Sequence, residues 1–232
     1  MLVAAAVCPH PPLIAPELAG AAAPELDGLR EACVSALRSL AEAAPDVLIA
    51  VGAAEEIAEP VAYGPDAAGS LAPWGADVRT GAGTPVLPLS LTVGRLLADL
   101  AGAGPVAGYQ AVPSGASPQQ CLRAGAELAG RAGRVGLLVM GDGSAKLTVK
   151  SPGYHDPRAE AYDEALARAL GGADARALAA LDAAEAAELW VAGRAAFQVL
   201  AGAAGEARPR GELLYHDAPY GVGYLVARWS LG

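Results

Sequence analysis

The chain begins with a short apolar run, residues 2–7, that ends abruptly at Cys8-Pro9-His10-Pro11-Pro12. An uncharged run of this length is typical of a strand buried in the centre of a sheet. The prolines remove backbone donors and disfavour helix, so the strand must stop here. His10 is therefore predicted to lie on a stiff loop at the carboxyl end of the strand, where open α/β sheets bind ligands. A loop histidine held only by structural hydrogen bonds is the alternative.

Apolar residues then alternate between helical and strand spacing. Residues 24–40 place apolar side chains at every third or fourth position, which predicts a helix with one buried face. Residues 46–51 form a second apolar strand, and the intervening helix is long enough to make the two strands parallel. The pattern predicts a helix at 89–100, a strand at 105–112, a helix capped by Ser117 that runs to 131, and a strand at 134–140.

The second half predicts helices at residues 156–170, 176–181 and 185–203, then two strands at 211–215 and 223–229. We therefore expect a single α/β domain over residues 1–232, with a central, mostly parallel mixed sheet flanked by helices and a C-terminal β-hairpin or strand pair. Residues 60–88 interrupt this order with Gly, Pro and Asp, apart from a short strand near residues 77–80. Loops of this length usually carry a function or cover a site.

Charge and composition limit the partners. The chain has 16 basic and 25 acidic residues, a net charge of −9, and no Lys/Arg cluster, which argues against nucleic acid or an anionic membrane as partner. An enzyme or a small-molecule binder fits better, and a homodimer is compatible with the sequence. No apolar run reaches the length of a membrane span, and the N-terminus lacks the basic flank of a signal peptide, so we expect a cytoplasmic protein.

A glycine-rich turn, Gly141-Asp142-Gly143-Ser144-Ala145-Lys146, follows the strand at 134–140. Its spacing matches neither a phosphate-binding loop nor a dinucleotide fingerprint, and Ser144 is not in a nucleophile elbow. A tight turn is therefore the simpler interpretation. Because parallel strands end at the same edge of a sheet, we expect this turn to lie near His10 and near Glu55 and Glu56, which follow the second strand.

Taken in order, four motifs resemble the class III extradiol ring-cleaving dioxygenases, in particular short bacterial chains that are similar to the catalytic subunit of these enzymes. The motifs are Cys8-Pro9-His10-Pro11-Pro12, Gly141-Asp142-Gly143-Ser144, Gly153-Tyr154 with Asp156-Pro157-Arg158, and Ala218-Pro219-Tyr220-Gly221-Val222-Gly223-Tyr224. The resemblance covers nearly the whole chain and implies an α/β fold with a mixed sheet.

In active members the resemblance implies a ferrous ion held by two histidines and one glutamate, with a further histidine as acid/base. Two histidines and one carboxylate leave adjacent iron positions open, so that a catecholate and O₂ can bind together. The further histidine takes a proton from the catechol hydroxyl and returns it later, which requires a pKa near neutrality.

Only part of this set carries over. His10 matches the first iron histidine, but residues 52–56, where the second should lie, contain no histidine. Ala145 stands at the acid/base position. Glu188, predicted at the start of the late helix, matches the glutamate ligand, with Glu185 as the alternative.

The remaining histidines match no family position. His155 precedes Asp156-Pro157 at the start of a predicted helix, where a surface or capping role is usual. His216 and Asp217 are predicted at the bend between the last strands, so His216 would either line a pocket at the strand ends or lie exposed.

Two functions are compatible with these residues. In the first, the chain is a non-catalytic descendant, a pseudoenzyme that binds a small molecule, for example an aromatic one, in a pocket of Cys8, His10, Glu55, Glu56, Asp142, Ser144 and His216. Any metal would be Fe²⁺ or another divalent ion at low occupancy on His10 and Glu188, and ordinary catechols would not be cleaved.

The alternative is an active metal-dependent oxidoreductase of the dioxygenase type whose site is rebuilt. Its ligands would be His10 with Glu55 or Glu56, Asp142 and Glu188, holding Fe²⁺, Mn²⁺ or Zn²⁺. A third interpretation makes Cys8 a nucleophile activated by His10, although a buried thiol is the commoner fate of a cysteine.

Overall fold

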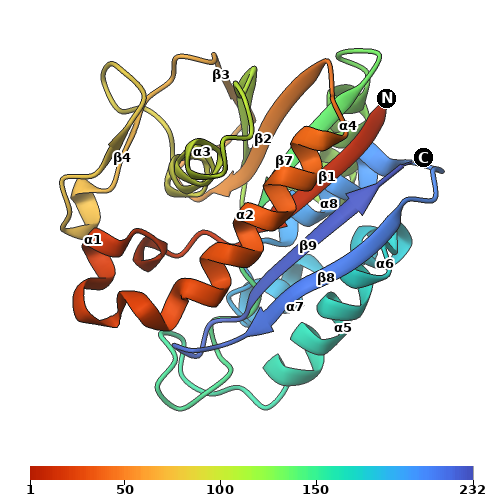
Figure 1. Ribbon diagram of the computed structural model, residues 1–232. Helices are drawn as coiled ribbons and strands as arrows, with labels where there is room; N and C mark the ends of the chain where they lie inside the picture. The colour runs from red at the N-terminus through yellow and green to blue at the C-terminus, as the bar shows by residue number, and fades with distance from the viewer. Residues whose placement is uncertain (232) are drawn as a thin grey trace.

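The computed structural model describes residues 1–231, and its centre is a seven-stranded mixed sheet in the order β3-β6-β2-β7-β1-β9-β8 (Figure 1). The strands are β1 (Leu2–Cys8), β2 (Val47–Ala54), β3 (Val61–Tyr63), β6 (Gly108–Pro113), β7 (Val135–Met140), β8 (Arg210–Asp217) and β9 (Tyr224–Ser230). The four inner strands, β6, β2, β7 and β1, run parallel, and β3, β9 and β8 pair antiparallel to their neighbours. The predicted fold class is confirmed, including the C-terminal strand pair.

The sheet is covered by helices on both faces. The helices are α1 (Pro16–Ala19), α2 (Asp27–Glu42), α3 (Leu89–Ala101), α4 (Pro118–Ala129), α5 (Ala159–Gly171), α6 (Ala175–Ala179), α7 (Ala183–Glu188) and α8 (Arg194–Ala204). Along β1, Ala4, Ala6 and Cys8 pack with α2 and α3, whereas Ala5 and Val7 pack on the side of α5 and α8. Period-two alternation of an uncharged strand therefore supplies two separate hydrophobic cores.

Strand register places the carboxyl ends of the inner strands at one edge. Cys8 of β1 lies opposite Met140 of β7, and Met140 lies opposite Gly52 of β2. Ala54 of β2 lies opposite Pro113 of β6. The loops after β1, β2 and β7 consequently emerge side by side, as predicted.

Helix α4 begins where the sequence predicted. Ser117 caps it in a capping box, since the Ser117 hydroxyl accepts from Gln120 N and the Gln120 side chain accepts from Ser117 N. The helix also lies close to α8, with no room for a side chain at two glycines. A Cβ at Gly125 or Gly202 would overlap the backbone oxygen of Val199 or Leu122, respectively.

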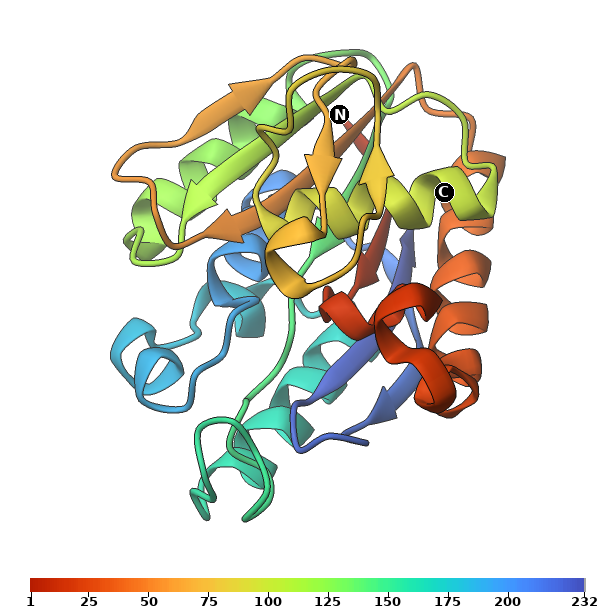
Figure 2. The ribbon, with the colours of Figure 1, turned by 90° about the vertical axis from the view of Figure 1, so that its left-hand side faces the viewer.

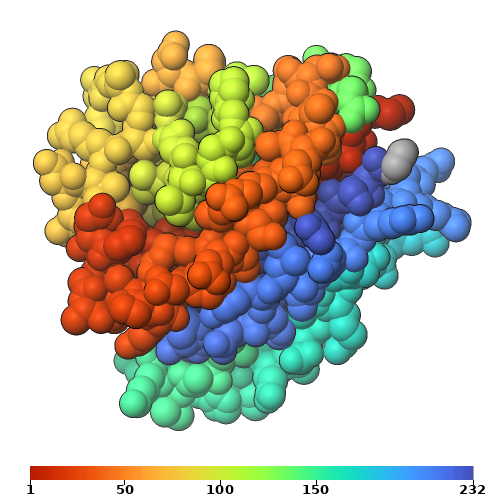
Figure 3. Space-filling model, in the orientation of Figure 1, coloured from red at the N-terminus to blue at the C-terminus, as the bar shows by residue number. Residues whose placement is uncertain are grey.

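Residues 60–88 are more ordered than the sequence indicated. Strand β3 extends the main sheet by pairing with β6, while β4 (Gly69–Ser70) and β5 (Arg79–Thr80) form a separate pair beside α3 (Figure 2). Arg95 of α3 holds this segment, because its Nη1 donates to the carbonyls of Pro65 and Ala67 at 2.8 and 3.0 Å. In the space-filling view, α2 crosses the molecule between this segment and strands β8 and β9 (Figure 3).

The prediction of one helix over residues 185–203 was wrong. The segment is broken between α7 and α8, where Trp190 has a φ of 55°. Gly193 lies in the break, and a Cβ there would overlap the ring of Phe197. Glu188 is therefore the last residue of α7 and not the first turn of a long helix. Within residues 1–231, no helix has the length and hydrophobicity needed to cross a membrane.

Candidate functional site

His10 and Asp142 meet at the carboxyl edge, between the loops that follow β1 and β7. The backbone N–H of His10 donates to Asp142 Oδ1 at 2.7 Å, and His10 Nδ1 lies 3.6 Å from the same oxygen. About a tenth of each side chain is exposed, 10% for His10 and 12% for Asp142. His10 Nδ1 is buried and has no hydrogen-bond partner among residues 1–231. The Asp142 carboxylate thus lies near Nδ1 without a hydrogen bond to it, and Nε2 is the other ring nitrogen that a ligand could contact.

The residues below this pair are buried. Cys8 and Cys33 are both fully buried. Burial is the main cause that raises the pKa of Cys33 well above its usual value, and the neighbouring Cys8 thiol is the second cause. Tyr224 is 3% exposed. Burial is the main cause that raises the pKa of its phenol, and the Asp142 carboxylate is the second cause. A fully buried Cys8 has no access to a substrate, so the nucleophile interpretation finds no support in this arrangement.

Two of the motifs quoted for the family resemblance contact each other. Gly143 N donates to Gly223 O at 2.7 Å, and Gly223 N donates to Ser144 O at 2.9 Å. The turn after β7 is thus paired with the segment before β9. Ser144 is fully buried, and its hydroxyl donates to Leu189 O at 2.7 Å, so it serves the backbone and is closed to solvent.

Asp163 is a residue that the sequence reasoning missed. This α5 side chain is 1% exposed, and its Oδ1 accepts from Ser144 N at 2.8 Å, while Oδ2 has no hydrogen-bond partner among residues 1–231. Burial, together with the Asp142 carboxylate, raises the pKa of Asp163 to about 7 against the lowering effect of the Ser144 N–H. A signal did exist in the sequence: Asp163 lies next to Tyr162 and three residues before Leu166, on the helical face predicted to be buried.

The glutamates named from the sequence are exposed. Strand β2 runs to Ala54, so Glu55 and Glu56 are the first residues beyond it, and both lie in solvent. The Glu188 carboxylate accepts from Arg158 Nη1 at 2.7 Å, with 60% of its side chain exposed. Glu188 is tied to the start of α5 and not to His10.

His216 is not at a bend, because β8 continues to Asp217 and His216 pairs with Leu225 of β9. Its side chain is exposed, as is that of His155. The prediction of a bend at His216 was wrong because β8 runs to Asp217, beyond Tyr215, where the predicted strand ended.

The residues present do not fit the iron site that the resemblance implies. Within residues 1–231, no group of three or more His, Cys, Asp or Glu side chains is arranged to hold a metal ion. His10 has Asp142 beside it, but Glu188 is occupied by Arg158, and Glu55 and Glu56 extend into solvent. One histidine with one carboxylate is too small a set for the two-histidine, one-carboxylate chemistry.

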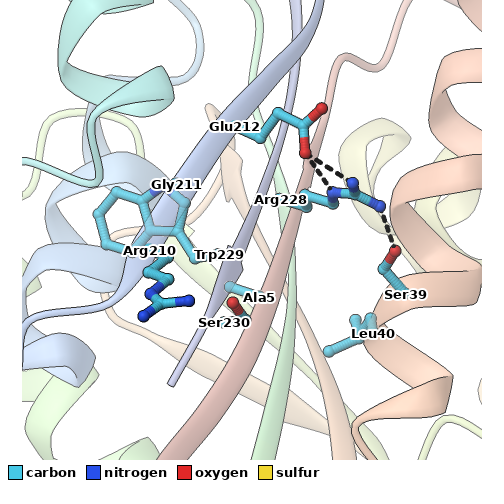
Figure 4. A pocket seen from close by; sticks show the side chains of 9 residues that line it. All are labelled: Ala5, Ser39, Leu40, Arg210, Gly211, Glu212, Arg228, Trp229 and Ser230. Atoms are coloured by element: carbon cyan, nitrogen blue, oxygen red, sulfur yellow. Dashed lines mark hydrogen bonds and ion pairs between the residues drawn. The ribbon is translucent and has the colours of Figure 1, made fainter. Parts of the chain in front are cut away.

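Two cavities lie away from the pair of His10 and Asp142. The first, of about 300 Å³, lies between α2 and strands β8 and β9, where Arg228 bridges Glu212 and Ser39 (Figure 4). The second, of about 590 Å³, is bordered by α5, α6 and α7. Of the candidate ligand and pocket residues chosen from the sequence, only Glu185 lines either cavity.

Comparison with known proteins identifies the fold but no family. No protein-family model matches the chain, and no curated protein matches it. Among solved structures, the crystal structure of uncharacterized protein JW3007 from Escherichia coli K12 is similar with a TM-score of 0.54 at 14% identity. The match covers 97% of this chain and 99% of that chain, so the fold is shared over the full length.

Proposed function

We propose that the protein is a diverged relative of the class III extradiol dioxygenases that binds a small molecule at the His10–Asp142 pair, without cleaving catechols. The observation that carries the proposal is the placement of a nine-tenths buried histidine against a buried carboxylate at the carboxyl edge of parallel strands. Ligands of open α/β sheets bind at this edge.

The chemistry of the pair favours a ligand with an acidic hydroxyl, such as a phenol. Asp142 lies beside Nδ1 and favours a proton on that nitrogen, which leaves Nε2 to accept a hydrogen bond or a proton from the ligand.

Ring cleavage requires groups that this edge lacks. The side chain of Ala145 has no group that can take up the catechol proton. Positioned acid/base groups typically contribute about 10²- to 10⁴-fold. The donor set at His10 does not fit an iron ion, so no step through iron is derived for this chain.

Calorimetric titration with catechol and phenol tests the binding proposal. We expect one binding site in the wild type, and affinity weakened about tenfold or more by His10→Ala because a hydrogen bond to the ligand hydroxyl is lost. His155→Ala, which removes an exposed histidine elsewhere, is the matched control and should bind as the wild type does. Equal binding by His10→Ala and wild type would refute the assignment of the site.

Oxygen uptake across a catechol panel tests the catalytic part. We expect none above background, even after anaerobic incubation with Fe²⁺. Turnover that disappears with Glu188→Ala would contradict the proposal and establish the alternative, an active oxidoreductase with a rebuilt metal site.

A further inference from the structure

The outer edge of β8 is the longer of the two unpaired edges of the main sheet. The sheet ends with β3 on one side and with β8 on the other (Figure 1). Strand β3 has three residues, whereas β8 has eight. Among residues 1–231, no backbone group of β8 bonds to the backbone of a segment other than β9. An unpaired strand edge of this length can pair with a strand of another chain.

A bulge in β8 decides which of its side chains share a face. Leu214 is the extra residue, because it has no partner in β9. Arg210 lies opposite Ser230, and Asp217 lies opposite Tyr224. These two β9 positions are six residues apart and lie on one face of the sheet, so the first and last residues of β8 also share that face. Without the bulge, two residues seven positions apart would lie on opposite faces.

The two end residues of β8 carry opposite charges, and neither charge has an ion-pair partner among residues 1–231. Arg210 is exposed, and in Figure 4 its guanidinium lies apart from the pair of Arg228 and Glu212. Asp217 is exposed too, and its Oδ1 accepts from Ala218 N at 2.7 Å. Glu212, which lies between these ends on the same face, is already paired with Arg228 at 2.6 Å. The edge therefore has one free positive charge at its start and one free negative charge at its end.

We infer that two copies of this chain pair through their β8 edges, antiparallel and about a two-fold axis at Leu213. Arg210 of each copy then lies beside Asp217 of the partner subunit, and the shared face lets the two side chains meet. Glu212 lies beside Tyr215 of the partner subunit, so no two like charges are directly opposite. Because the edge is complementary to itself, it fits a second copy better than an unrelated protein.

Charge reversal tests this pairing. Sedimentation velocity at rising protein concentration is expected to show a monomer–dimer equilibrium in the wild type. Arg210→Glu and Asp217→Arg should each weaken dimerisation about tenfold or more, because each substitution turns two attractive pairs into two repulsive ones. The combination of both substitutions places opposite charges side by side again and should bring the affinity back towards that of the wild type.

Two controls make the outcome decisive. Arg123→Glu makes the same charge change at an exposed position of α4 and should dimerise as the wild type does. Amide hydrogen exchange in β8 should slow as the dimer forms, whereas exchange in β3 should not change. Circular dichroism of each variant verifies that the fold is retained. A chain that stays monomeric at every concentration, or a dimer equally stable in Arg210→Glu and Arg123→Glu, would overturn the inference.

Discussion

The carboxyl edge of the sheet has two halves that carry similar residues and behave differently. At β1 and β7, Asp142 is nearly buried, beside His10, and the loop that bears it is bonded to Gly223, Asp163 and Leu189. At β2, the successive carboxylates Glu55 and Glu56 extend into solvent. A carboxylate at a strand end is therefore enclosed only where segments from elsewhere in the chain close over it.

The difference arises from the segments that pack against each strand end. The turn after β7 is pressed between α5, the segment before β9 and the break between α7 and α8, where Gly193 N donates to Asp142 O at 2.9 Å. These segments are far apart in sequence, and glycine at positions 143, 193 and 223 lets them approach closely. Glu55 and Glu56 have no such enclosure and remain exposed.

The largest expected effect comes from adding a side chain where these segments approach each other closely. A Cβ at Gly223 would overlap Asp163 Oδ2, so Gly223→Ala should lower the free energy of unfolding by about 3 kcal/mol. Gly115→Ala is the control, since a Cβ there meets nothing within 4 Å. Urea denaturation of both variants measures the difference. Similar midpoints for the two would show that the enclosed half tolerates expansion.

The next largest effect is the change in folding stability with pH that Asp163 causes. Because burial raises its pKa to about 7, the folded chain holds this proton more tightly than the unfolded chain, where the pKa is about 3.9. The stability that this group contributes is complete below about pH 4 and is lost as the pH rises through about 7. Between about pH 5 and about pH 7 the loss should be about 2 kcal/mol, at up to about 1.4 kcal/mol per pH unit for one proton.

Asp163→Asn removes this titration while keeping the shape of the side chain. Thermal or urea denaturation at several pH values should therefore give a flatter stability profile for Asp163→Asn than for the wild type. The exposed Glu164→Gln serves as the control and should keep the wild-type slope. Parallel profiles for Asp163→Asn and wild type would mean that the buried carboxyl does not hold its proton.

The smallest effect is expected at the open half of the edge. The double substitution Glu55→Gln with Glu56→Gln should change the free energy of unfolding by less than about 0.5 kcal/mol, as is usual for exposed positions. It should also leave catechol or phenol binding unchanged. A clear loss of binding would place these carboxylates in the site and remove the contrast between the two halves.

Much of the fold could be predicted from local patterns. Residues 2–7, 46–51 and 134–140 are apolar runs, which indicated β1, β2 and β7, and a helix between successive strands implied parallel pairing. The prolines after β1 placed His10 at the carboxyl edge, and the glycine-rich turn placed Asp142 there too, so their proximity followed from topology. The break at Trp190 could not be predicted, since no proline or capping motif marks it, and the position of Glu188 was lost with it.

The sequence by itself determined the strands of the main sheet except β3, most of the helices and the edge at which His10 lies. These features depend on periodicity and on proline chemistry within a few residues. Only the tertiary structure decided which polar side chains are enclosed. Asp163 is buried because α5 packs against Ser144 of the turn after β7 and against Gly223, both distant in sequence. Glu188 is exposed at the end of α7, where it pairs with Arg158 at the surface. Burial and pairing depend on neighbours distant in the chain, and a linear pattern carries no record of them.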